Sequence, residues 1–232
     1  MAFSMSTKVF IKSIYTDFTE AEMPKTQILI IASLLAVWML PLNVVGQPSI
    51  SGDLSGILGP GTYIVEGNCT VQFGNGLTIE PGTTFLFAGH YSFTVYGQLN
   101  ADGTETDSIK FIRQFPTEEC RHGGVRFQSG SSENSTLSYC WIDHAKNQDF
   151  PFYFGGGIYC SNVAITISNC RISKCKAERG AGLYAINAPV TITACVFEAN
   201  LADVSGGGIQ LHRSDGAEVS YCVIYENTAT GT

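Results

Sequence analysis

The stretch Gly155-Gly156-Gly157-Ile158-Tyr159 decides the fold, because it recurs as Gly180-Ala181-Gly182-Leu183-Tyr184 and as Gly206-Gly207-Gly208-Ile209-Gln210. The offsets between the three copies are 25 and 26 residues. A second marker, a Cys followed two positions later by an apolar residue, recurs in phase with the first at Cys140, Cys170, Cys195 and Cys222. Two markers in phase indicate that each period is one structural unit of a repeat protein.

Apolar and polar residues alternate within each period, as in Ala164-Ile165-Thr166-Ile167-Ser168, and this alternation is typical of a strand. Units made of short strands bury their apolar faces only by stacking on neighbouring units. Leucine-rich repeats have a similar period, but their Leu-x-x-Leu-x-Leu frame is missing here. We therefore predict an all-β chain that folds as a right-handed parallel β-helix, a solenoid with coils of about 25 residues.

Stacking gives the repeated columns a physical role, since equivalent residues of successive coils lie about 4.8 Å apart. We expect the four repeated cysteines to form an inward column. Asn200 and Asn227 are expected at an inward corner, where their amides satisfy backbone groups. The Gly clusters are expected at another corner, where they provide positive φ or close backbone approach.

The same columns, followed along the chain, set the predicted boundaries. We place the β-helix at residues 76–232, with an insertion at 148–154. Residues 47–75 are expected to cap the N-terminal end of the stack, since a solenoid needs a polar cap. No cap is visible at Thr232, so we expect the chain to be truncated there or its end to stack on something else.

One coil resembles a known repeat family. Phe197-Glu198-Ala199-Asn200, followed by Gly206-Gly207-Gly208-Ile209, resembles the Phe-x-x-Asn and Gly-Gly-Ala-Ile pair of polymorphic outer-membrane-protein repeats. The other coils depart from Phe-x-x-Asn, and Gly replaces Ala in the second element. The chain is also similar to bacterial right-handed β-helix repeat proteins with a pectin-lyase-like fold. The resemblance implies an exported, adhesin-like solenoid, with a bacterial outer membrane as its location, and leaves its attachment open.

An apolar stretch at 28–40 follows Lys25 and precedes a small-residue pattern that ends at Gly46. This arrangement is typical of a signal peptide. A membrane anchor is the alternative, but the stretch is shorter than the roughly 20 residues that span a bilayer. Residues 1–46 are therefore predicted to be a leader and signal peptide that starts at Met1 or at Met23. The mature chain is predicted to be secreted or on the cell surface, without a membrane span.

The charge balance restricts the partners. The chain has 13 Lys and Arg against 20 Asp and Glu, which gives a net charge of −7. No basic run is long enough to follow a phosphate backbone, so nucleic acid is not an expected partner. The expected partners are an extracellular glycan or a surface protein.

β-Helices include polysaccharide lyases and hydrolases, so residues suited to their chemistry are candidates for a catalytic site. Glycoside hydrolysis needs two paired carboxylates, and the candidates are scattered. They are Asp143, Glu198, Asp203 and Asp215, of which Asp143 and Glu198 share a column. A lyase would need calcium held by carboxylates beside a basic residue, and Asp203, Arg213 and Asp215 come nearest. We expect no catalytic residue, no metal site and no cofactor, with calcium required only if the lyase alternative holds.

The eight cysteines allow two interpretations. Exported chains often form disulfides, but four of these cysteines occupy one repeated apolar position, where buried thiols pack well. We therefore favour reduced, buried thiols for that column. Cys69, Cys120, Cys160 and Cys175 remain available, and the sequence cannot pair them.

The strand after each Gly cluster suggests a binding surface. With the apolar residues of this strand inward, the residues between them form one outward column. This column comprises Arg126, Tyr159, Tyr184 and Gln210, and His212 follows at the end of the last strand. Stacked exposed tyrosines are suited to sugar rings. The sequence thus favours an exported, non-catalytic β-helix for adhesion or carbohydrate contact, with a pectate-lyase-like polysaccharide lyase or hydrolase as the alternative.

Overall fold

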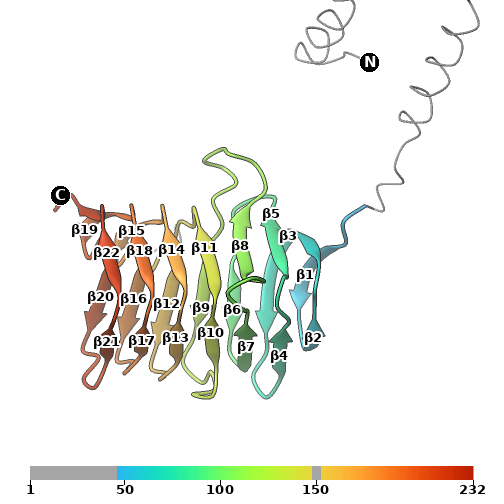
Figure 1. Cartoon of the computed structure of the whole chain (residues 1–232), viewed down its shortest axis with the longest axis horizontal. Coiled ribbons are helices and arrows are strands. Elements are labelled where there is room, and N and C mark those ends of the chain that lie inside the picture. The colour runs from blue at the N-terminus through green and yellow to red at the C-terminus, as the bar shows by residue number, and fades with distance from the viewer. Residues whose placement is uncertain (1–45, 148–152, 232) are drawn as a thin grey trace, which may run out of the picture. The chain divides into compact units, whose positions relative to one another are not determined.

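The computed structural model of the chain describes residues 46–147 and 153–231. These residues form parallel strands and turns without any α-helix, wound into a stack of coils (Figure 1). The predicted parallel β-helix is therefore confirmed. The predicted leader and signal peptide, and most of the predicted insertion, lie outside the described residues. No helix among the described residues is long and apolar enough to cross a membrane.

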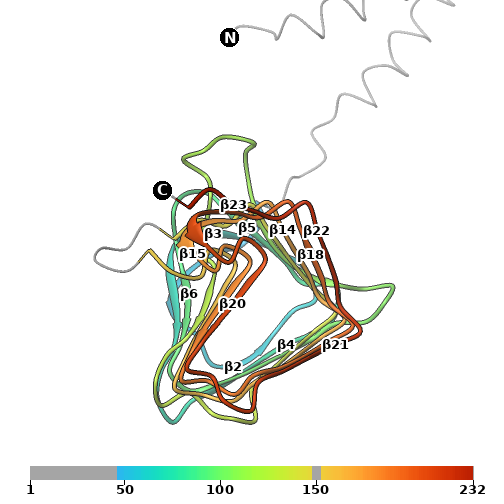
Figure 2. The same cartoon turned by 90° about the vertical axis from the view of Figure 1, so that its left-hand side faces the viewer.

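Each regular coil runs through three long faces, and the coils outline a triangle when viewed along the stack (Figure 2). The glycine face consists of β6 (Phe93–Val95), β9 (Val125–Phe127), β12 (Ile158–Ser161), β16 (Leu183–Ile186) and β20 (Ile209–His212). The middle face consists of β2 (Gly56–Leu58), β4 (Gly76–Ile79), β7 (Gln98–Asp102), β10 (Thr136–Ser138), β13 (Thr166–Ser168), β17 (Thr191–Thr193) and β21 (Glu218–Ser220). The cysteine face consists of β5 (Thr84–Phe87), β8 (Ile109–Arg113), β11 (Cys140–Asp143), β14 (Arg171–Ser173), β18 (Val196–Glu198) and β22 (Val223–Tyr225).

Two further groups of strands complete the stack. A short fourth segment of the later coils contains β15 (Lys176–Arg179), β19 (Leu201–Ser205) and β23 (Thr228–Ala229). At the other end, β3 (Thr62–Val71) turns a corner, because its first half pairs with β5 and its second half with β6. The strand β1 (Ser49–Asp53) pairs with β3. The solenoid sheets thus include residues on the N-terminal side of Gly76.

The repeat markers lie in register, as the sequence predicts. Ile158 pairs with Leu183, and Leu183 pairs with Ile209. On the cysteine face, Ile172 pairs with Phe197 in the next coil. Since one residue of slip would turn every side chain to the opposite face, this register keeps all the apolar columns directed inward.

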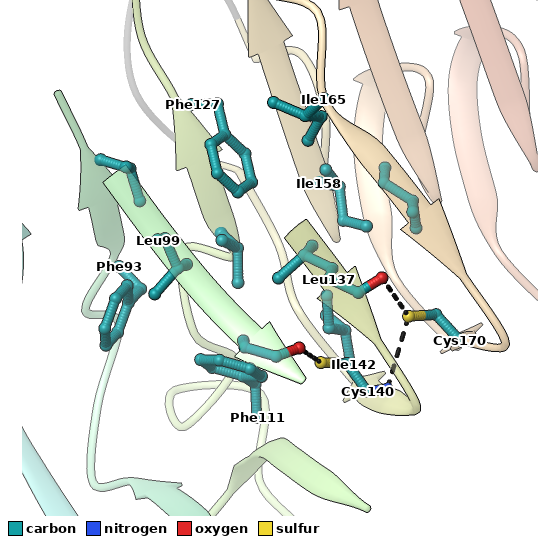
Figure 3. Packing of buried hydrophobic residues seen from close by; sticks show 14 of the residues in the cluster. Phe93, Leu99, Phe111, Phe127, Leu137, Cys140, Ile142, Ile158, Ile165 and Cys170 are labelled. Carbon is teal, nitrogen blue, oxygen red and sulfur yellow. Dashed lines mark hydrogen bonds between the residues drawn. The ribbon is translucent and has the colours of Figure 1, made fainter. Parts of the chain in front are cut away.

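The interior is a continuous column of apolar side chains whose composition changes along the stack. The N-terminal coils contain packed rings, with the centroids of Phe85 and Phe111 4.9 Å apart. The later coils contain mainly aliphatic side chains and thiols in the same columns, with Phe197 as a buried ring (Figure 3). In the last coil, Ile224 is 52% exposed although its equivalent Phe197 is fully buried, because β22 has a paired neighbour on one side only.

Thiols line one corner of the triangle as a hydrogen-bonded ladder. The backbone N–H of Cys140 donates to Sγ of Cys170 at 3.4 Å, and the Cys170 thiol donates to the carbonyl of Leu137 at 3.4 Å (Figure 3). Cys170 and Cys195 repeat the first of these contacts one coil later, again at 3.4 Å. The predicted inward column is confirmed, and all eight cysteines of the chain are free thiols.

Amides form a second ladder at the corner after the cysteine face. Oδ1 of Asn200 accepts the backbone N–H of Cys175 at 2.9 Å, and its Nδ2 donates to the carbonyl of Ile172 at 3.0 Å. Asn227 makes the same two contacts one coil later, with the backbone of Asn200 and of Phe197. In both ladders a side chain accepts the backbone N–H of one residue in the preceding coil. The same side chain donates to the backbone carbonyl that lies three residues before that N–H in the sequence.

The corners force ordinary residues into the left-handed region. Within residues 46–147 and 153–231, eleven residues other than Gly have φ between 48° and 58°, and all of them lie at coil corners. They are Tyr139, His144, Asn162, Asn169, Lys174, Asn187, Ala194, Ala199, Arg213, Tyr221 and Glu226. This conformation costs roughly 1–2 kcal/mol for a residue with a Cβ, so the paired strands on both sides must hold it.

Candidate functional site

The predicted outward column on the glycine face is in register. Arg126 pairs with Tyr159, Tyr159 with Tyr184, and Tyr184 with Gln210. The Arg126 guanidinium lies 4.7 Å from the centroid of the Tyr159 ring. The rings of Tyr159 and Tyr184 are nearly parallel, with centroids 6.1 Å apart and 4° between their planes. The alternation of the strand alone positions these side chains together.

This column is less open than the sequence suggests, because Phe154 covers part of it. The Phe154 ring stacks on Tyr184 with centroids 4.8 Å apart. Tyr184 is only 3% exposed, and Arg126 donates to the backbone carbonyls of Gly155 and Phe154 at 3.2 and 3.3 Å. The expectation that both tyrosines are exposed is therefore wrong for Tyr184. The members of the predicted set that remain accessible to solvent on this face are Tyr159, Gln210 and His212, of which His212 is exposed.

A second cluster lies on the outer side of the cysteine face, around Trp141 on β11. Trp141 and Arg171 occupy paired positions, and the Arg171 guanidinium is 5.7 Å from the Trp141 ring centroid. The indole Nε1–H donates to Oγ of Ser173 at 3.2 Å, which fixes the ring on the sheet. The side chain of Arg171 is 49% exposed. An aromatic ring and a half-exposed guanidinium are thus presented together.

A shallow hollow adjoins this cluster at the corner between the middle and cysteine faces. It has a volume of about 240 Å³. It is lined by Trp141 and Arg171 together with Thr104, Glu105, Ser108, Tyr139, Cys140 and Asn169. The hollow therefore combines one large aromatic surface with charged, hydroxyl and amide groups, a composition that is suited to a polar ligand with an apolar side.

Polar side chains continue from the hollow along the next column of the same face. Ser173 donates to Oδ1 of Asp143 at 2.6 Å, and Nδ1 of His144 lies 2.5 Å from Oδ2 of Asp143. One coil beyond Ser173, Glu198 accepts a hydrogen bond from Nε of Arg171 at 3.0 Å and a second from Nη2. Asp143, Ser173 and Glu198 are successive members of one column.

The electrostatics of this column do not make Glu198 or His144 a proton donor at neutral pH. The hydrogen bonds from Arg171 and then from Tyr225 lower the pKa of Glu198, so its carboxylate is ionised. Burial lowers the pKa of His144, which leaves its ring neutral. Two coil spacings separate Asp143 and Glu198, about 10 Å, which is near the upper limit for the carboxyl pair of an inverting glycosidase. Such an enzyme also needs one carboxyl with a raised pKa, and Glu198 has a lowered one.

The long loop after β8 packs against the end of the cysteine face. His122 is fully buried and stacks on Phe87 with centroids 4.3 Å apart. Its Nδ1 accepts the Gly124 N–H at 3.2 Å, so its Nε2 is the protonated nitrogen that faces the carbonyl of Asp143. Burial lowers the pKa of His122 to about 3. Arg121 donates to the carbonyl of Lys174 at 2.7 Å. These contacts are structural.

The other candidates from the sequence are dispersed. Asp203, Arg213 and Asp215 lie on β19 and in the turn after β20, and among the described residues no group of three or more His, Cys, Asp or Glu side chains is arranged to hold a metal ion. Trp141 and Arg171 were missed as site residues because they appear in the sequence only beside the cysteine marker. Their position between two inward residues of a repeated strand would have revealed that they face outward.

Comparison with known families supports the fold. Residues 118–232 match the family model described as a right handed beta helix region. The match agrees with the predicted right-handed parallel β-helix and covers the coils that carry the glycine and cysteine markers. No curated protein and no solved structure matches the chain.

Proposed function

We propose that this β-helix is a non-catalytic glycan-binding protein whose contact surface is the outer side of the cysteine face. The observation that carries the proposal is the pairing of Trp141 and Arg171 beside the hollow of about 240 Å³. One side of a sugar ring presents C–H groups and packs on an aromatic face, while its hydroxyls hydrogen-bond to guanidinium and amide groups. Arg171, whose guanidinium lies over one face of the indole, and Asn169 supply such groups in the lining of the hollow.

The rigidity of the surface supports binding. Trp141 is fixed by its hydrogen bond to Ser173, and Arg171 is held by Glu198. Both anchors are on strands with paired neighbours on either side, so little conformational entropy is lost when a ligand binds. The solenoid repeats the outer columns at intervals of about 4.8 Å, which suits an extended chain of sugar units. An exported location, at a bacterial cell surface or secreted, agrees with this proposal and with the predicted signal peptide.

The polysaccharide-cleaving alternative rests on Asp143 and Glu198, which share one column of the same face. Their separation of two coils, about 10 Å, is at the upper limit for an inverting mechanism, and the lowered pKa of Glu198 opposes a role as general acid. The glycan-binding proposal is therefore preferred, and the same experiment tests both.

The test is an array of neutral and acidic oligosaccharides probed with the purified chain, followed by calorimetry on the glycans that are retained. We expect Trp141→Ala and Arg171→Ala each to weaken binding by about tenfold or more, as for anchors of an interface. The matched control is Tyr221→Ala, since Tyr221 is an aromatic residue that is 91% exposed and lies outside the hollow. Equal affinity of the wild type and Trp141→Ala would overturn the proposal. Release of shorter sugars from a retained glycan would favour the enzyme instead.

A further inference from the structure

A second hollow lies on the other side of the molecule from the cysteine face, at the corner between the glycine and middle faces. Its volume is about 300 Å³. Its side-chain lining comprises Phe73, Asn75, Tyr96, Gln98 and Ser132, and the rest is glycine. None of the described residues that line it is charged. We call this hollow the corner notch.

The notch exists because three successive coils turn this corner with different numbers of residues. The first coil uses four residues, 72–75, and the third uses eight, 128–135. The second coil uses only Tyr96 and Gly97 between β6 and β7. A short turn between two longer turns leaves a gap, and the two longer turns form its walls.

Backbone contacts hold the floor of the notch. The N–H groups of Tyr96 and Gly97 both donate to the carbonyl of Val71, at 2.8 and 3.1 Å. A Cβ on Gly97 would lie 2.2 Å from the carbonyl oxygen of Asn75, so only glycine fits there. The short turn therefore lies directly on the preceding coil, and no side chain at Gly97 fills the space.

Two aromatic side chains are exposed at the notch. Phe73 is 79% exposed and Tyr96 is 40% exposed, in contrast to the fully buried Phe residues of the core. A Cβ on Gly130 would lie 3.8 Å from Cδ2 of Phe73, which shows that the ring extends across to the third-coil turn. Exposing a Phe ring has a cost in water, so an exposed pair at one hollow points to a ligand.

Amide and hydroxyl groups lie beside these rings. Oε1 of Gln98 accepts a hydrogen bond from Oγ of Ser132 at 3.4 Å, which orients the carboxamide. A carboxamide both donates and accepts, and it is therefore suited to a ligand with neighbouring hydroxyls. The lack of charge in the lining disfavours acidic sugars, which would lose hydration without gaining an ion pair.

We propose that the corner notch binds one ring of a neutral sugar, with the C–H face of the ring against Phe73 and Tyr96 and its hydroxyls toward Gln98 and Ser132. The site does not use Trp141 or Arg171 and goes beyond the function proposed above. The ligand class also differs from that of the cysteine face, where Arg171 and Glu105 bring charge.

The test uses ligand-detected NMR and calorimetry with cellobiose, maltose, lactose and glucuronic acid as probes. It is carried out in a Trp141→Ala background, so that failure of the cysteine-face site does not affect the result. We expect at least one neutral disaccharide to bind with a millimolar dissociation constant and glucuronic acid to bind more weakly. Phe73→Ala should weaken binding about tenfold or more.

Two further variants make this experiment decisive. Gln98→Leu keeps the approximate size of the side chain and removes its hydrogen bonds, and it should also weaken binding. Phe115→Ala is the control, because Phe115 is 53% exposed in the loop after β8 and does not line the notch. Equal binding by Phe73→Ala and the Trp141→Ala parent would overturn the proposal. Binding of a polyproline peptide but of no sugar would overturn it as well.

Discussion

The backbone N–H of Cys170 and the Sγ of Cys195 are joined by a hydrogen bond of 3.4 Å that links two successive coils. The contact reproduces, with sulfur, what Oδ1 of Asn200 does for the N–H of Cys175. Two corners of the triangle thus satisfy their inward backbone groups through side chains of the next coil. One corner uses thiols and the other uses amides, and the stability of the stack depends on both.

Removing an amide from the ladder should destabilise the fold more in an inner coil than in the last coil. Asn200→Ala leaves the N–H of Cys175 and the carbonyl of Ile172 without their partner, and each such buried group costs about 1–3 kcal/mol. We expect a loss of about 3 kcal/mol in the free energy of unfolding, measured by urea denaturation. Asn227→Ala is the matched control in the half-open last coil and should cost less. Equal losses for the two variants would contradict the ladder argument.

The thiol ladder should be chemically inert while the chain is folded. Burial raises the pKa of the Cys170 thiol, and the hydrogen bond with Cys170 together with burial raises that of Cys195. Because the thiolate is the reactive form, we expect a disulfide reagent at pH 8 to label Cys222 first. Cys222 is the one member of the column that is not fully enclosed. Labelling in urea should reach all eight thiols, and Cys222→Ser should abolish the early phase. Rapid labelling of Cys170 in the native chain would contradict the prediction.

Close backbone contact between coils should make the stability of the fold sensitive to a side chain at Gly157. A Cβ at Gly157 would lie 2.6 Å from the carbonyl oxygen of Gly182 and 2.8 Å from Cγ2 of Ile172. Gly157→Ala should therefore cost about 2 kcal/mol or more in the free energy of unfolding. Gly76→Ala is the control, since nothing lies within 4 Å of its added Cβ, and its thermal midpoint should stay close to that of the wild type. A neutral Gly157→Ala would show that the coils can separate at this corner.

His122 should make stability depend on pH. Burial lowers its pKa from 6.5 to about 3, so between these values the unfolded chain carries a proton that the folded chain does not. Above pH 6.5 both states leave the ring neutral, and His122 does not affect the free energy of unfolding. As the pH falls from 6.5 to about 3, protonation in the unfolded chain lowers the free energy of unfolding by about 1.4 kcal/mol for each pH unit. His122→Gln should reduce this slope by about one proton in urea unfolding measured from pH 4 to 7. An unchanged slope would mean that other groups account for the acid sensitivity.

The columns and the fold were predictable because they depend on sequence periodicity. Cys170, Asn200 and Gly180 recur at fixed offsets, and stacking alone converts those offsets into a thiol column, an amide ladder and a corner of positive φ. The left-handed corners at Ala194, Ala199 and Lys174 were not predictable, since these residue types carry no local preference for that conformation.

The sites were predicted less well because they depend on contacts outside the repeat. Phe154 belongs to the irregular segment between two coils, and nothing in the sequence indicates that its ring covers Tyr184. The corner notch depends on a difference in turn length between coils, which is visible only once the strand ends are known. Trp141 was predictable in direction, but its hydrogen bond to Ser173 required the register of β11 and β14.

The unequal turns at one corner have a consequence for how such a molecule can change. An extra residue inside β7 would reverse the direction of every side chain that follows it in the strand, whereas an extra residue in the turn at 128–135 would alter only the rim of the notch. The strands of the faces thus do not tolerate insertions, whereas the turns at the corners do. New specificities can arise at one edge of the triangle, turn by turn, while the interior remains as it was.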